Sequence, residues 1–131
     1  MKKLILDIDG TLTIDSDADY SSKPVNEELV RKCIEYKEKG FEIILFTSRN
    51  MRTFDGNVGK INANTIPILI EWLDKNGIPY DEVHVGKPWC GFEGFYVDDK
   101  AVRPSEFCNL SYSEIQALIE KENPYKDGGN K

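Results

Sequence analysis

The feature that most constrains this chain is the stretch Lys2–Thr13, KKLILDIDGTLT. The apolar run Leu4–Leu6 is typical of a buried strand, and it leads directly into two acids, Asp7 and Asp9. Side chains two residues apart on an extended chain point the same way, so both carboxylates face one space. Carboxylates this close repel each other unless a cation or a reaction uses them. The stretch therefore predicts a strand that ends in a charged site.

Length and composition indicate a small globular protein. The chain has 131 residues, enough for one hydrophobic core and too few for two ordinary domains. We expect a single domain over residues 1–123 and a flexible tail over residues 124–131. The net charge of −6 argues against a surface that binds nucleic acid or an anionic membrane.

Apolar runs and cysteines indicate the compartment. The run Phe41–Phe46 is far too short to cross a bilayer, and the N-terminus lacks the apolar core of a signal peptide. The spacing of Cys33, Cys90 and Cys108 fits neither a CxxC metal site nor a disulfide framework. We therefore expect a cytoplasmic protein with reduced thiols.

Alternating apolar patterns predict strands and helices in turn. Further strands are expected at residues 41–46, 82–85 and 95–97. Helices are expected from Asn26 to Gly40, from residue 62 or 64 to 76, and from residue 111 or 113 to a point before Pro124. This alternation favours a parallel α/β sheet but does not give the order of its strands.

Polar side chains follow the carboxyl end of each expected strand, which is where ligands bind in open α/β sheets. They are Thr47, Ser48, Arg49 and Asn50 after the second strand, Lys87 after the third, and Asp98 and Asp99 after the fourth. A second acidic pair repeats the electrostatic cost of the first, and one divalent cation would remove both costs. Hard oxygen ligands of this kind suit Mg²⁺.

The connection after the first strand carries a partial calcium-loop pattern. Asp15, Asp17 and Asp19 have the spacing of calcium ligands, but Tyr20 stands where the turn glycine belongs and Asn26 where the final glutamate belongs. We therefore interpret residues 11–24 as a solvated flap over the end of the first strand.

Four short motifs occur in the order found in haloacid dehalogenase-type phosphatases. They are DIDGT at residues 7–11, Thr47 at the end of a hydrophobic strand, Lys87 in GKP, and the pair Asp98-Asp99. One motif alone is weak, whereas four in order are specific. The longer run from VGKIN through HVGKPW to FYVDDKAVRPSEF resembles a branch of small phosphatases associated with capsular polysaccharide biosynthesis.

This resemblance implies a fold and an open site. The implied fold is a three-layer, Rossmann-like α/β sandwich whose parallel sheet has the strand order 4-1-2-3. The chain has no room for an inserted cap domain, so it resembles the capless members of the family. Such members either accept large substrates or cover the site with a neighbouring subunit, so a homo-oligomer is one expectation.

The resemblance also implies roles for the motif residues. Asp7 resembles the nucleophile that forms an aspartyl-phosphate. Asp9 resembles the general acid that protonates the leaving oxygen and then acts as base, and we expect nearby negative charge to keep it protonated when substrate arrives. Thr47 resembles the hydroxyl that holds a phosphoryl oxygen, and Lys87 the cation that steadies the nucleophile.

Metal and substrate contacts follow from the same resemblance. Mg²⁺ would be bound by Asp7, the backbone carbonyl of Asp9, and Asp98, with Asp99 as a further ligand or a support behind the ligands. The residues expected to contact substrate are Gly10, Ser48, Arg49, Arg52 and Lys60, the last three at the leaving group.

The implied function is Mg²⁺-dependent hydrolysis of a small phosphomonoester, a sugar or polyol phosphate of polysaccharide assembly. A nucleotide phosphate is the nearest alternative substrate. A receiver-type signalling domain combines similar residues, but receivers keep adjacent acids after the first strand and the phosphorylated aspartate after the third. Here the first strand bears DxD and the third leads to Gly86-Lys87, so the order decides against a receiver.

Overall fold

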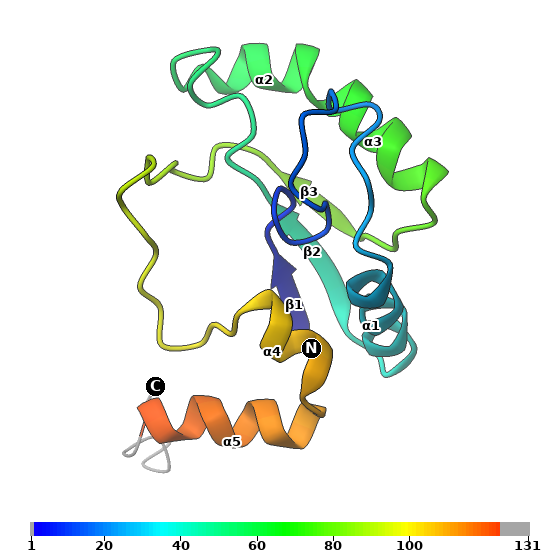
Figure 1. Cartoon of the computed structure of the whole chain (residues 1–131), viewed down its shortest axis with the longest axis vertical. Helices are drawn as coiled ribbons and strands as arrows, with labels where there is room; N and C mark the ends of the chain where they lie inside the picture. The colour runs from blue at the N-terminus through cyan, green and yellow to red at the C-terminus, as the bar shows by residue number, and fades with distance from the viewer. Residues whose placement is uncertain (1, 124–131) are drawn as a thin grey trace. The chain divides into compact units, whose positions relative to one another are not determined.

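The computed structural model describes residues 2–123 of the chain. Contacts divide the chain into two compact units, Met1–Trp89 and Cys90–Lys131, and we describe each unit by itself (Figure 1). The single domain expected over residues 1–123 stays a prediction, and the expected tail lies outside the described residues. None of the helices in residues 2–123 has the length and apolarity needed to span a membrane.

The first unit is built on a parallel sheet of three strands in the order β1-β2-β3, drawn at the centre of Figure 1. The strands are β1 (Lys3–Leu6), β2 (Glu42–Phe46) and β3 (Glu82–His84). Leu6 pairs with Leu45, and Phe46 pairs with His84. This register brings the carboxyl ends of all three strands to one edge of the sheet, where the polar motifs begin.

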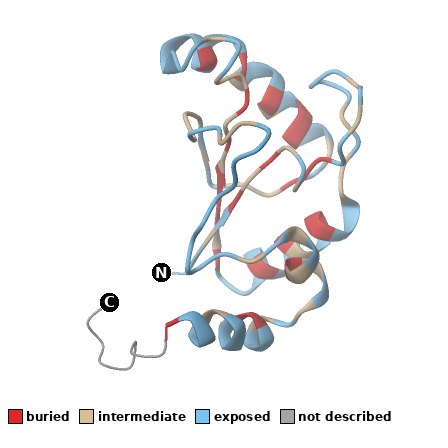
Figure 2. Ribbon diagram, turned by 60° about the vertical axis from the view of Figure 1, so that its left-hand side comes forward, coloured by how far each residue is buried: buried red, intermediate tan, exposed pale blue. Residues whose placement is uncertain are grey.

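Three helices accompany the sheet in the first unit: α1 (Glu27–Glu38), α2 (Val58–Asn64) and α3 (Ile66–Lys75). As predicted, Asn26 caps α1 by accepting a hydrogen bond from the Leu29 amide at 3.3 Å. Figure 2 shows buried residues in the strands and on single faces of the helices, the arrangement of an amphipathic α/β core. The α/β fold with a parallel sheet is therefore confirmed, and residues 2–123 contain no cap domain.

The second predicted helix is two helices. Pro67 has no amide hydrogen to donate, so a helix tolerates it only in the first turn, and α3 accordingly begins at Ile66. The preceding helix, α2, is capped by Asn57 and so begins before the predicted start at residue 62 or 64. Sequence periodicity did not reveal α2 because Ile61 is its one buried side chain.

The second unit contains α4 (Pro104–Asn109) and α5 (Tyr112–Glu122) among its described residues. Of the two predicted starts, residues 111 and 113, Ser111 is the cap of α5. Its hydroxyl accepts from the Glu114 amide at 3.2 Å, while the Glu114 carboxylate accepts from the Ser111 amide at 2.8 Å. The short helix α4 was not predicted, because a single turn with Phe107 buried carries no helical periodicity.

The predicted fourth strand at residues 95–97 is not formed. Phe95 and Val97 are 78% and 88% exposed, and no strand ladder includes this segment. So short a strand depends on ladder hydrogen bonds and side-chain burial, and the segment has neither in this structure. The predicted strand order is confirmed for β1, β2 and β3, and the place of residues 95–97 beside β1 stays a prediction.

Candidate functional site

Asp7 and Asp9 are held at the end of β1 by a buried residue and a tight turn. Ile8, between them, is completely buried, and its carbonyl accepts three backbone amides at 2.8 to 3.1 Å. Gly10 adopts a positive φ of 82°, which permits the sharp exit from the strand, and its amide donates to Thr13 Oγ1 at 3.0 Å. The position of both carboxylates is therefore fixed by backbone hydrogen bonds rather than by a mobile loop.

Residues from three motifs meet where the strands end. Lys87 Nζ lies 3.5 Å from Asp7 Oδ1. The Lys87 amide donates to the Thr47 carbonyl at 3.1 Å, and the Thr47 amide donates to the His84 carbonyl at 2.9 Å. The backbone after β2 is thus tied to the backbone after β3, which positions the Lys87 side chain against the end of β1.

The charge on Asp7 is only partly balanced. Burial raises the pKa of the Asp7 carboxyl above its ordinary value, the Lys87 cation opposes this rise, and the Asp9 charge adds to it. The ionised carboxylate therefore has less positive charge around it than its burial requires. A divalent cation would supply that charge.

The oxygen donors of the first unit fit Mg²⁺ in kind but not in number. The Asp7 carboxylate and the Asp9 carbonyl are hard oxygen ligands, which Mg²⁺ prefers. Within each unit of the described chain, no three Asp, Glu, His or Cys side chains come together as a metal site. The first unit by itself therefore supplies only part of a magnesium coordination shell, and the predicted metal site stays a prediction.

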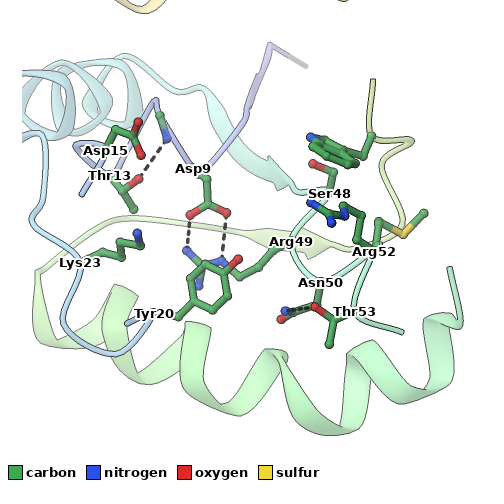
Figure 3. A pocket seen from close by; sticks show the side chains of 13 residues that line it. Asp9, Thr13, Asp15, Tyr20, Lys23, Ser48, Arg49, Asn50, Arg52 and Thr53 are labelled. Carbon is green, nitrogen blue, oxygen red and sulfur yellow. Dashed lines mark hydrogen bonds and ion pairs between the residues drawn. The ribbon is translucent and has the colours of Figure 1, made fainter. Parts of the chain in front are cut away.

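Asp9 forms a two-point contact with Arg49, whose side chain is only 1% exposed. Arg49 Nε donates to Asp9 Oδ2 at 3.0 Å and Nη2 donates to Oδ1 at 2.8 Å (Figure 3). The guanidinium carbon lies 4.1 Å from the centre of the Tyr20 ring. The Arg49 amide donates to Thr47 Oγ1 at 3.0 Å, so the Thr47 hydroxyl keeps its own hydrogen for another acceptor.

This contact bears on the expected role of Asp9 as an acid. The expectation that negative neighbours keep Asp9 protonated did not include the guanidinium of Arg49. A carboxylate whose two oxygens both accept from a guanidinium has the geometry of the ionised form. The structure thus places both Asp9 oxygens against Arg49, and the expected role of Asp9 as acid and base stays a prediction.

A cavity of about 660 Å³ opens beside Asp9 within the first unit. Its lining combines cations, aromatic rings, acids and small polar side chains: Lys23, Arg49, Arg52, Tyr20, Trp89, Asp9, Asp15, Thr13, Ser48, Asn50, Thr53, Gly10 and Met51. Asp7 is not part of the lining, whereas Asp9, the residue expected at the leaving oxygen, is. The cavity therefore opens beside Asp9 rather than beside Asp7.

Four of the five residues expected to contact substrate line this cavity, namely Gly10, Ser48, Arg49 and Arg52. The fifth, Lys60, is exposed in α2 and is not part of the lining. The direct leaving-group contact expected of Arg49 stays a prediction, because the structure commits its guanidinium to Asp9 and Tyr20.

Sequence reasoning missed the part of the site that the flap supplies. Tyr20 and Lys23 line the cavity, and Lys23 Nζ donates to the Ser16 carbonyl at 2.5 Å. A single antiparallel bridge between Thr13 and Val25 closes the base of the flap. An aromatic residue in an otherwise polar connection was the available signal, and it was interpreted as solvated chain.

His84 and the second acid pair lie at the remaining strand ends. The His84 side chain is exposed, with Nε2 2.7 Å from Glu82 Oε1, and the His84 carbonyl accepts the Thr47 amide. Asp98 and Asp99 belong to the second unit, where both are exposed and Asp98 Oδ1 accepts the Lys100 amide at 2.9 Å. Their role as metal ligands stays a prediction.

Comparisons with known proteins extend over nearly the whole chain. Residues 4–123 match the model of the haloacid dehalogenase-like hydrolase family. A protein from Vibrio cholerae, known from a crystal structure, is 56% identical, with a TM-score of 0.92 over 93% of this chain and 99% of that one. A comparison with curated proteins gives no match. The matched residues include all four motifs.

Proposed function

The chain belongs to the haloacid dehalogenase-like hydrolases, and from this premise we propose that it is a Mg²⁺-dependent phosphomonoester hydrolase. The observation that carries the proposal is the meeting of Asp7, Thr47 and Lys87 at the ends of neighbouring strands, with Asp7 and Lys87 3.5 Å apart. A nucleophilic carboxylate, a hydroxyl donor and a cation are the groups that phosphoryl transfer needs.

In the first step, an Asp7 oxygen attacks phosphorus and the bond from phosphorus to the leaving oxygen breaks. Asp9 gives its proton to that oxygen, so the leaving group departs as an alcohol. Lys87 and the Thr47 hydroxyl stabilise the charge on the phosphoryl oxygens. The product on the protein is an aspartyl-phosphate at Asp7.

In the second step, Asp9 takes a proton from water, and the resulting oxygen attacks phosphorus. The bond from phosphorus to the Asp7 oxygen breaks, which releases inorganic phosphate and restores both carboxyl groups. Arg49 supports this step because its two-point contact fixes the position of the Asp9 carboxylate that takes the proton.

Mg²⁺, when bound, supplies positive charge that balances the Asp7 carboxylate against the phosphoryl group. The chain's residues that would hold it are Asp7, the Asp9 carbonyl and Asp98, with Asp99 as a further ligand or a support. The raised pKa of Asp7 favours this assignment, because it marks a buried carboxylate that lacks positive charge.

We place the substrate among small phosphorylated metabolites, as a sugar or polyol phosphate of polysaccharide biosynthesis. The resemblance of the VGKIN, HVGKPW and FYVDDKAVRPSEF segments to the capsular phosphatase branch supports this pathway. A nucleotide phosphate is the alternative. The polar cavity beside Asp9 has space for a leaving group of either class.

The test is hydrolysis of p-nitrophenyl phosphate by the purified chain. We expect turnover with Mg²⁺, suppression by EDTA, and recovery when excess Mg²⁺ is returned. Turnover that EDTA does not change would remove the metal from the proposal. Absence of turnover with p-nitrophenyl phosphate and with a panel of phosphorylated sugars, polyols and nucleotides would remove the phosphatase assignment.

A further inference from the structure

The cavity beside Asp9 is positively charged in a chain that is acidic overall. Three cations line it, Lys23, Arg49 and Arg52, against two acids, Asp9 and Asp15, whereas the chain has a net charge of −6. Arg49 and Asp9 balance each other through their two-point contact. Positive charge concentrated in this cavity indicates a ligand with negative charge beyond the phosphate that reacts at Asp7.

Cations cover the aromatic rings of this cavity. The Arg52 guanidinium lies 5.2 Å from the centre of the Trp89 ring, and Arg49 and Lys23 lie 4.1 and 5.9 Å from the centre of the Tyr20 ring. A nucleobase would have to displace these cations in order to stack on the faces they cover. The rings therefore support cations rather than offer a platform for a base.

Arg52 is the cation best placed to recognise a second anion. Of the three cations, Arg49 is buried against Asp9 and Lys23 is half-buried. Arg52 is exposed to solvent, and a guanidinium held over a ring presents its N–H groups along its edge, the geometry that matches a carboxylate. In Figure 3, Asp9 lies between Lys23 on one side and Ser48 and Arg52 on the other.

We propose that Arg52, supported by Trp89, binds a carboxylate at the far end of the leaving group, so that the preferred substrates are phosphates of polyhydroxy acids rather than of neutral sugars or nucleosides. This inference rests on the proposed phosphatase function. Asp9 marks the part of the cavity that receives the leaving oxygen, and Ser48, drawn on the same side of Asp9 as Arg52 in Figure 3, can bond a hydroxyl group of the leaving group.

The test compares two substrates that differ in one group. Gluconate 6-phosphate carries a carboxylate where sorbitol 6-phosphate carries a CH₂OH group, and the phosphate ends are the same. A hydrogen bond between charged groups predicts that the native chain has about tenfold or more higher kcat/KM for gluconate 6-phosphate. Arg52→Gln should bring the ratio of the two kcat/KM values close to one, because it lowers kcat/KM for gluconate 6-phosphate far more than for sorbitol 6-phosphate.

Two further variants separate recognition from general charge and folding effects. Arg52→Lys keeps the positive charge but loses the forked guanidinium geometry that matches a carboxylate. It should therefore keep only part of the preference for gluconate 6-phosphate. Arg31→Gln removes an exposed arginine of α1 outside this cavity and should keep all of it. Thermal unfolding of each variant shows whether it is folded.

Equal kcat/KM for the two substrates in the native chain would overturn the inference, as would an equal loss for both in folded Arg52→Gln. Higher kcat/KM for adenosine 5′-monophosphate than for gluconate 6-phosphate would also overturn it, in favour of a nucleotide. In each case, continued turnover of p-nitrophenyl phosphate shows that the proposed function stands without it. Loss of the proposed function is instead marked by no turnover of any phosphomonoester.

Discussion

The two units carry acid pairs that look alike in the sequence and differ in structure. In the first unit, Asp7 follows β1, whose last residue, Leu6, is 6% exposed and paired with Leu45 of β2. In the second unit, Asp98 follows Val97, which is 88% exposed and outside any strand. An apolar run followed by acids thus becomes a fixed site only where a neighbouring strand supplies hydrogen bonds and burial.

The largest effect is expected for a change in the acid pair of the first unit, Asp7 and Asp9. Asp7→Asn should lower turnover of p-nitrophenyl phosphate at least about a thousandfold, because the amide cannot attack phosphorus. Asp17→Asn, in the exposed part of the flap, is the matched control and should keep native turnover. Most of the turnover surviving in folded Asp7→Asn would contradict the covalent route.

The next effect tests whether the exposed pair completes the same site. Asp98→Asn should raise the Mg²⁺ concentration for half-maximal turnover by about a hundredfold, and Asp99→Asn by about tenfold, since the first is the expected direct ligand. Titration of turnover with Mg²⁺ measures both. The reverse order would assign Asp99 as the ligand, and native behaviour in both variants would confine the metal site to the first unit.

A smaller effect tests the contact that fixes Asp9. Arg49→Met should lower the free energy of unfolding by roughly 1–3 kcal/mol, the range for hydrogen bonds to charged groups. Arg49→Lys should recover only part of this, because an ammonium group cannot make the two-point contact with Asp9. Urea unfolding measures the difference, with Arg31→Gln as the control, and native stability in Arg49→Met would show that the pair adds nothing net.

The smallest effect is a pH dependence of stability without metal. Burial raises the pKa of Asp7 in the folded chain above its ordinary value of 3.8, so the folded state holds the proton more tightly than the unfolded state. The free energy of unfolding should therefore fall as pH rises from 3.8 to the raised folded pKa. Asp7→Asn in EDTA should lack this fall and be the more stable chain above that window, as urea unfolding at several pH values would show.

Local sequence patterns predicted the structural features that depend on contacts between residues close together in the chain. The cap at Asn26 and the cap at Ser111 are local hydrogen bonds between residues three apart, so the sequence indicated both helix starts. Short elements with one buried side chain, such as α2 and α4, lack periodicity and were missed. The predicted strand at 95–97 is not formed, because apolar composition by itself does not supply a pairing partner.

The sequence by itself determined the α/β alternation, the family, and the residue types that end each strand, because these follow from periodicity and from motifs of a few adjacent residues. The tertiary structure alone decided that Arg49 binds Asp9 rather than lying open to substrate, and that Tyr20 and Trp89 hold cations around one cavity. Those contacts join residues that are distant along the chain. Only the register of the parallel strands and the closure of the flap bring such residues within reach of each other.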